Sequence, residues 1–293
     1  MIPLISADAL QVLLHDTTRD VLVLDARFDL ANPVAGLEAW RDGHIAHALY
    51  ADLDQDLSGP IIPGVTGRHP LPDAMAWQPT LRRWGVTTDS VIVLYDAGNS
   101  MFAARAWWML RWAGLTQVLV LNGGIAAWQE AGFALSTDVA ERATSDVVIQ
   151  PHHEWLVSAD ELLANPEQYQ LFDARAYARF SGQTEPLDKK AGHIPGAVCL
   201  DFSQNLQANG QFLPPVALRE RFAGVGIVLP VSTASSTCFM EDKQVVCYCG
   251  SGVSACHNIL AMVSAGLPMP LLYAGSWSEW IQDDARPVAT GDA

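Results

Sequence analysis

The residue best suited to covalent chemistry in this chain is a cysteine in a short loop that contains two glycines. The loop reads Cys249-Gly250-Ser251-Gly252-Val253-Ser254 and follows the apolar run Val245–Tyr248. Such a run, bounded by a turn, is typical of a buried parallel strand. Gly250 and Gly252 allow backbone conformations that are closed to other residues. We therefore expect Cys249 at the carboxyl end of a strand, surrounded by backbone amides.

The residues after the loop predict a helix. Ser254 is the expected N-cap, the helix extends to about Ala265, and Gly266 ends it. A helix N-terminus and a ring of backbone N–H groups both favour negative charge. Because the thiolate and not the thiol is the nucleophile, this position predicts a reactive Cys249. The alternative is a buried structural cysteine, which is the common state of a free thiol.

The loop resembles the active-site loop of the rhodanese superfamily, in its 3-mercaptopyruvate sulfurtransferase branch, where it reads Cys-Gly-Ser/Thr-Gly-Val-Thr. This chain has Ser254 in place of the usual threonine. The resemblance implies that Cys249 attacks the sulfur of a donor, forms a persulfide and passes the outer sulfur to a second nucleophile. The backbone amides of Gly250, Gly252, Val253 and Ser254 are expected to stabilise both sulfur anions.

The residues directly after the cysteine bear on the identity of the donor. Family members specialised for thiosulfate carry basic residues there, whereas this chain has the uncharged Gly250 and Ser251. The uncharged loop favours 3-mercaptopyruvate, and loss of sulfur from that donor leaves an enolate that needs a proton. The resemblance implies a Ser–His–Asp relay made of Ser251, His69 and Asp54, and histidine suits proton transfer near neutrality. The alternatives are an exposed loop histidine and a solvated aspartate in a turn.

A donor with a carboxylate needs cations to bind it. Arg179 matches the first substrate arginine of the family, and a guanidinium can bind a carboxylate through two hydrogen bonds. The second family arginine follows a Glu-Pro pair, but here Glu185-Pro186 is followed by Leu187. Lys189 or Lys190 is expected to supply a point charge instead. This departure keeps thiosulfate open as the donor, and a surface position is the alternative for Arg179.

The two halves of the chain repeat one another. Five motifs of the first half recur in the same order in the second. Leu24-Asp25-Ala26-Arg27 returns as Phe172-Asp173-Ala174-Arg175, and Gly43-His44-Ile45 returns as Gly192-His193-Ile194. This pattern indicates a duplicated domain.

The chain of 293 residues is long enough for two domains. We expect an N-terminal domain over 1–140, a linker over 141–155 and a C-terminal catalytic domain over 156–293. Each half alternates strand-like and helix-like segments, which predicts an α/β fold with a central, mostly parallel sheet and helices on both faces. With the resemblance, this becomes two tandem rhodanese-like domains. The predicted segments of the first half are strands Val21–Leu24, Val91–Tyr95 and Val118–Leu121 and a helix over Ala103–Ala113.

The repeat fails at the reactive position, where the first half has Asp96 in place of Cys249. An aspartate cannot carry sulfane sulfur. The N-terminal domain is therefore expected to be catalytically inactive and to form one side of the cleft. A helix-capping aspartate is compatible with this interpretation.

Composition excludes several classes of function. The formal net charge of −15 argues against nucleic acid and anionic membranes as partners. No run of about 18 apolar residues is present, and the first residues do not resemble a signal peptide, so we expect a cytoplasmic protein. The five cysteines all lie in the second half, and neither their number nor their spacing fits a disulfide framework or a zinc site. We expect no metal and no cofactor.

Three rival functions can be compared with this interpretation. A phosphatase of this fold needs an arginine six residues after the cysteine, and Ala255 at that position argues against it. The enzymatic alternative is thiosulfate:cyanide sulfur transfer through the same Cys249 persulfide. The alternative from another class is a non-catalytic sulfur-relay scaffold. The expected partners are a small-molecule sulfur donor and a thiol, cyanide or thioredoxin-like acceptor.

Overall fold

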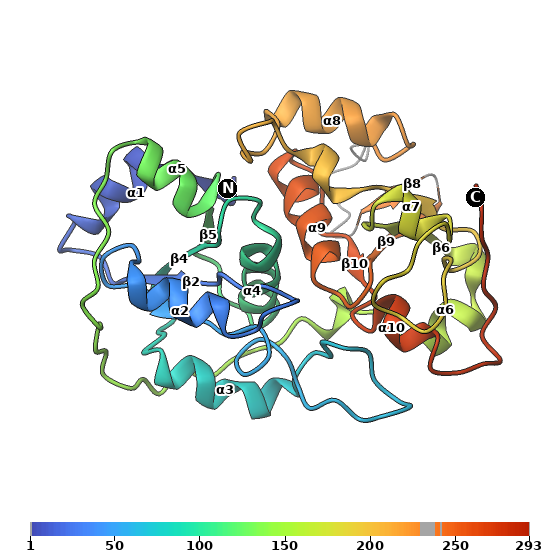
Figure 1. The fold of residues 1–293 in the computed structure, drawn as a ribbon, viewed down its shortest axis with the longest axis horizontal. Helices are drawn as coiled ribbons and strands as arrows, with labels where there is room; N and C mark the ends of the chain where they lie inside the picture. The colour runs from blue at the N-terminus through green and yellow to red at the C-terminus, as the bar shows by residue number, and fades with distance from the viewer. Residues whose placement is uncertain (1, 229–237, 241, 293) are drawn as a thin grey trace.

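The computed structural model describes residues 2–228, 238–240 and 242–292, and within them each half of the chain forms its own five-stranded sheet (Figure 1). The strands are β1 (Leu4–Ile5), β2 (Val21–Asp25), β3 (Leu49–Tyr50), β4 (Val91–Tyr95), β5 (Val118–Leu121), β6 (Tyr169–Asp173), β7 (Val198–Cys199), β8 (Phe239–Met240), β9 (Lys243–Tyr248) and β10 (Leu271–Leu272). The first sheet has the order β1-β5-β4-β2-β3 and is parallel throughout. The second has the order β10-β9-β6-β7, also parallel, with β8 added antiparallel to β9.

Helices connect and cover the strands, as expected for a parallel sheet. They are α1 (Ala7–Leu14), α2 (Ala35–Asp42), α3 (Ala74–Arg83), α4 (Met101–Trp112), α5 (Gly124–Glu130), α6 (Ala159–Ala164), α7 (Tyr177–Phe180), α8 (Pro215–Ala223), α9 (Ser254–Ser264) and α10 (Ser276–Trp280), with short 3-10 turns η1 (His153–Trp155), η2 (Pro166–Gln168) and η3 (Phe202–Asn205). The predicted fold class, two α/β units with mostly parallel sheets, is confirmed.

The central strands form where the apolar runs predicted them. All five side chains of β4 are buried, so this strand reads as a continuous apolar segment. Strand β9 begins at Lys243, two residues before the predicted Val245, because its first residues pair with β8. Helix α4 begins at Met101 rather than at the predicted Ala103.

The predicted N-cap of α9 is wrong by one residue. The cap is Val253, and Ser254 is already the first helical residue. The cause lies in the turn before it. Gly252 takes a left-handed conformation at φ +78°, and Val253 then enters the right-handed helical region at φ −89°. A Cβ on Gly252 would lie 2.4 Å from the carbonyl oxygen of Ala274, so this turn requires glycine.

Helices α4 and α9 join the two halves. Each follows the loop that ends the central strand of its own sheet, and the two pack against each other in the middle of the molecule (Figure 1). Trp107 and Trp108 of α4 are fully buried, and the helix is apolar on nearly all sides, as expected for a helix enclosed between two sheets. This packing brings the loop after β9 within hydrogen-bonding distance of the first half.

The repeated sequence motifs have the same role in both halves. Each arginine of the Asp-x-Arg motif pairs with the aspartate two residues before it, at 2.6 Å for Arg27 and 2.7 Å for Arg175. Each also donates a hydrogen bond of 2.7 Å to the carbonyl of the Gly-His-Ile motif, at Gly43 and Gly192 respectively. The motifs thus attach the segment after β2 or β6 to the turn that leads into the next strand.

The segment that joins the halves is packed against the first half. Residues 137–152 contain no helix or strand in the described structure, but Val147 and Ile149 are buried. The backbone N–H of Ile149 donates to the side chain of Gln78 at 3.1 Å. The domain boundaries predicted from the sequence stay a prediction.

Over the described residues, every helix is too short or too polar to cross a lipid bilayer.

Candidate functional site

Cys249 directly follows β9, and its side chain is almost wholly buried, with 2% of the residue exposed. Its backbone is held by the segment that begins α10. The N–H of Cys249 donates to Ser276 Oγ at 3.0 Å, and its carbonyl accepts from the N–H of Trp277 at 2.9 Å. Ser276 has an uncommon positive φ of 55°, and its hydroxyl donates to the carbonyl of Tyr273 at 3.0 Å. These contacts fix the position of the cysteine relative to the sheet.

The equivalent loop in the first half encloses a carboxylate. Asp96 is buried, and its two carboxylate oxygens accept hydrogen bonds from the backbone N–H groups of Gly98, Ser100 and Phe102 at 3.0 Å and of Ala103 at 3.2 Å. Burial raises the pKa of Asp96, and these four hydrogen bonds oppose the rise. The loop after β4 therefore binds an anion through four backbone N–H groups. In the first half the anion is the aspartate itself, which also caps α4.

The structure brings together the three residues expected to form a relay. His69 Nδ1 lies 2.8 Å from Ser251 Oγ, and His69 Nε2 lies 3.5 Å from an oxygen of Asp54. His69 is 7% exposed, which excludes the alternative of an exposed loop histidine. The Asp54 side chain is 42% exposed, so it forms the outer end of the chain of contacts. His69 and Asp54 come from the first half and Ser251 from the second.

Electrostatics keep His69 neutral at physiological pH. Burial, followed by the positive charges of Arg105 and Arg68, lowers the pKa of His69 to about 4. Burial and the nearby carboxylate of Asp52 raise the pKa of Asp54. A neutral imidazole with its Nε2–H toward Asp54 leaves Nδ1 free to accept a proton from the Ser251 hydroxyl.

Sequence reasoning missed Arg105, a fully buried arginine in the middle of α4. Its guanidinium donates to the carbonyl of Gly252 at 3.2 Å, and on the other side to the carbonyls of Leu57 at 3.1 Å and His69 at 3.2 Å. Arg105 therefore joins the loop that contains Cys249 to the segment that contains His69. A charged residue inside the apolar sequence Ala-Ala-Arg-Ala-Trp-Trp was the available signal.

Arg105 is also a buried cation without a carboxylate partner within ion-pair distance in the part of the chain that the structure describes. Burial lowers the pKa of Arg105, and the nearby thiols of Cys256 and Cys249 oppose this. An unpaired buried cation is costly, and a neighbouring thiolate or persulfide anion compensates its charge. Burial raises the pKa of the Cys256 thiol to about 12, and the charge of Arg105 opposes this rise.

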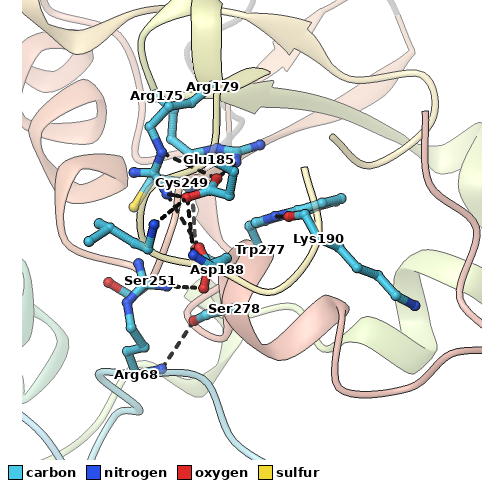
Figure 2. A network of polar contacts seen from close by, with 12 residues as sticks. Arg68, Arg175, Arg179, Glu185, Asp188, Lys190, Cys249, Ser251, Trp277 and Ser278 are labelled. Atoms are coloured by element: carbon cyan, nitrogen blue, oxygen red, sulfur yellow. Dashed lines mark hydrogen bonds and ion pairs between the residues drawn. The ribbon is translucent and has the colours of Figure 1, made fainter. Parts of the chain in front are cut away.

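Arg179 lies at the loop and not on an open surface. A Cβ on Gly250 would lie 3.5 Å from both terminal nitrogens of Arg179. The guanidinium pairs with Glu185 at 2.7 Å and contacts Asp188 at 3.3 Å (Figure 2). The structure thus brings Arg179 next to the residue that follows Cys249, as its position in the sequence predicted.

The expectation for Lys189 and Lys190 needs correction. The Lys190 ammonium pairs with Asp284, and Figure 2 shows its side chain directed away from Cys249. Lys189 is exposed, and its charge acts on the same aspartate. No contact joins either lysine to the Cys249 loop among the described residues. The backbone carbonyl of Lys190 accepts a hydrogen bond from the indole N–H of Trp277 at 2.9 Å, while its ammonium pairs with Asp284.

The end of the Cys249 loop is enclosed by the protein. Val253 and Ser254 are buried at the start of α9. Within the described residues, histidine, cysteine and carboxylate side chains form no group of three suited to a metal ion.

Comparisons with known proteins identify the family to which the chain belongs. The model of the rhodanese-like domain matches the chain twice, over residues 6–131 and 158–283. A probable 3-mercaptopyruvate sulfurtransferase of Pseudomonas aeruginosa is 49% identical over 276 residues, which cover 93% of both chains. A putative thiosulfate sulfurtransferase of Mycobacterium tuberculosis is 37% identical, over 93% of this chain and 92% of the relative. The crystal structure of a 3-mercaptopyruvate sulfotransferase from Escherichia coli is 30% identical and aligns with a TM-score of 0.78 over 95% of this chain and 100% of the other. The resemblance inferred from the sequence is confirmed.

Proposed function

The chain belongs to the rhodanese family and is a sulfurtransferase, and we propose that it takes sulfur from 3-mercaptopyruvate through a persulfide on Cys249. The observation that carries this proposal is the contact of 2.8 Å between Ser251 Oγ and His69 Nδ1, next to the nucleophile. Such a pair serves a donor whose product needs a proton. When thiosulfate donates its outer sulfur, the leaving group is sulfite, which needs no proton on carbon, so the pair would have no proton to transfer.

The proposed step balances without a further reactant. The Cys249 thiolate attacks the sulfur of the donor thiol, the new S–S bond forms, and the bond from sulfur to C3 breaks with its electron pair going to pyruvate enolate. The proton of the donor thiol leaves the persulfide and reaches C3. The products are a persulfide anion on Cys249 and pyruvate. His69 is neutral and accepts a proton from Ser251, so the two together move this proton from sulfur to carbon.

The surrounding groups have separate tasks in this proposal. Backbone N–H groups at the start of α9 stabilise the thiolate and the persulfide anion, and the buried charge of Arg105 adds to this. Arg179 binds the donor carboxylate. Asp54 orients the imidazole of His69.

Thiosulfate is the second candidate donor. It is supported by the relative from Mycobacterium tuberculosis and by the uncharged but arginine-flanked loop, which accommodates a small dianion. The acceptor is proposed to be a thiol, cyanide or a thioredoxin-like protein. A cytoplasmic location stays a prediction.

Steady-state kinetics with the two donors test the proposal. We expect kcat/KM for 3-mercaptopyruvate to exceed that for thiosulfate, with pyruvate released in equal amount to the sulfur transferred. A higher value for thiosulfate would reverse the order of the two donors. Failure to turn over either donor with cyanide or a thiol, although Cys249 takes up sulfur, would favour a sulfur-relay scaffold.

A further inference from the structure

Arg68 reaches the second half of the molecule from a loop of the first half. Its backbone N–H donates to Ser278 Oγ at 3.0 Å, within α10. The residue before it is glycine for a steric reason, because a Cβ on Gly67 would lie 2.5 Å from the same Oγ and 2.7 Å from the carbonyl oxygen of Gly275. The backbone at Arg68 is therefore held tightly against the second half, immediately before His69.

The side chain of Arg68 lies beside the nucleophile loop. A Cβ on Gly250 would be 3.0 Å from Arg68 Nη2 and 3.5 Å from both terminal nitrogens of Arg179. Figure 2 shows the two arginines approaching this loop from different segments, with Cys249 next to them. Two guanidinium groups thus flank the residue that directly follows the cysteine.

A carboxylate already lies between these two cations. One oxygen of Asp188 pairs with Arg68, and the other lies 3.3 Å from Arg179 Nη2 (Figure 2). The Asp188 side chain is only 5% exposed. Its backbone N–H donates to Glu185 at 3.2 Å, which fixes the loop that carries it. The two arginines that flank Gly250 therefore bind a carboxylate between them.

We propose that Arg68 and Arg179 together bind the donor's carboxylate, which exchanges with Asp188, so that Arg68 is a specificity-determining residue contributed by the half of the chain that lacks the nucleophile. This inference rests on the proposed function, because it assumes a donor with a carboxylate. Arg68 is then the second cation at the carboxylate, a place that the sequence had assigned to Lys189 or Lys190. Asp188 stabilises the arginines in the absence of donor and competes with the donor in its presence.

The inference predicts opposite effects for two partners in one ion pair. Arg68→Gln should raise KM for 3-mercaptopyruvate by about tenfold to a hundredfold, the usual range for one charge-assisted contact. Asp188→Asn should lower KM, because the donor no longer competes with an internal carboxylate. If the pair only ties the two halves together, both variants loosen the same contact and change KM in the same direction. Arg68→Lys should lie between wild type and Arg68→Gln, because an ammonium keeps the charge but loses the planar geometry.

A second donor makes the test specific for the carboxylate. Mercaptoacetone carries the ketone and thiol of 3-mercaptopyruvate but no carboxylate. Arg68→Gln should leave kcat/KM for mercaptoacetone within about twofold of wild type while it reduces the value for 3-mercaptopyruvate. Arg19→Gln, which removes an exposed ion pair with Asp16, serves as the matched control and should change neither. Thermal unfolding of every variant checks that the fold is intact.

The outcomes separate the inference from the function on which it rests. Wild-type protein that does not turn over 3-mercaptopyruvate contradicts the proposed function. Active wild-type protein with an unchanged KM in Arg68→Gln, an equal loss with both donors, or a raised KM in Asp188→Asn contradicts the inference alone.

Discussion

The loops that follow β4 and β9 occupy equivalent positions in the two halves and differ in the residue at the end of the strand. In the first half Asp96 fills its own loop and uses four backbone N–H groups. In the second half the equivalent residue is the thiol of Cys249, and we propose that the backbone N–H groups up to Ser254 stabilise the negative charge that sulfur transfer creates there. The comparison teaches that the loop after β4 is already occupied by its own carboxylate, which leaves the proposed sulfur chemistry to the loop after β9.

The first half nevertheless supplies much of the site. His69 contacts Ser251, Arg105 contacts the carbonyl of Gly252, and Arg68 lies beside Gly250. The half without the proposed nucleophile thus contributes three side chains that lie at the Cys249 loop. Substitutions that make the two loops alike, or remove one of these partners, therefore test the comparison.

The largest effect is expected when the second loop is given the residue of the first. Cys249→Asp should fold, because the first-half loop already accommodates a carboxylate, and it should lose all turnover of both donors. Cys249→Ser should be equally inactive. Assays with 3-mercaptopyruvate and with thiosulfate, beside a thermal unfolding measurement, check both results. Residual turnover above background would mean that the nucleophile lies elsewhere.

Removing the imidazole should affect one donor much more than the other. His69→Ala should reduce kcat for 3-mercaptopyruvate by about 10²- to 10⁴-fold, the usual contribution of an acid–base group, and that for thiosulfate by far less. Single-turnover kinetics with each donor provide the comparison. Equal losses would remove the relay from the mechanism.

The pH dependence of the wild type tests the same residue. Because the pKa of His69 is lowered to about 4, its neutral form predominates above that value. The rate with 3-mercaptopyruvate should therefore show no loss through His69 as the pH falls past 6.5, and the loss that is due to His69 should begin only on approach to about pH 4. A limb near pH 6.5 that disappears in His69→Ala would contradict this.

Arg105 should separate activity from stability. Arg105→Met removes a buried charge that has no carboxylate partner but also its hydrogen bonds to three carbonyls, so the two effects oppose each other and the unfolding temperature should change little. Activity should fall by about a hundredfold, as for loss of one electrostatic stabiliser. The rate of Cys249 alkylation by iodoacetamide at pH 7 should fall with it. A destabilised protein whose residual folded fraction alkylates at the wild-type rate would assign Arg105 a structural role only.

The smallest effect on activity is expected from the first-half loop. Asp96→Ala leaves several backbone N–H groups without acceptors and should lower the free energy of unfolding by about 1–3 kcal/mol. The kcat of the folded fraction should change less than about threefold, because Asp96 takes no part in the chemistry. Urea unfolding and activity at saturating donor measure the two quantities. A large loss of kcat at unchanged stability would show that the first-half loop acts on the site.

The sequence predicted those features that follow from short-range patterns. Apolar runs located β4 and β5 at their observed bounds, while the role that the loop sequence assigns to Cys249 stays a proposal. Ser251 and His69 were recognised through resemblance, and the structure brings them into contact.

Features that depend on contacts between distant segments could not be read in the same way. Arg105 and Arg68 reach the loop because α4 packs on α9 and because Gly67 fits against Gly275. Neither contact has a periodicity in the sequence. Lys190 was expected at the site from its place in the chain, but its ammonium pairs with Asp284, which lies 94 residues further along the sequence.

The most direct measurement is intact-protein and peptide mass spectrometry of wild-type protein treated with 3-mercaptopyruvate in the absence of an acceptor. The account predicts a gain of about 32 daltons, one sulfur atom, confined to the peptide with Cys249 and lost when a thiol is added. No gain in mass, or a gain located on Cys247 or Cys256, would contradict it.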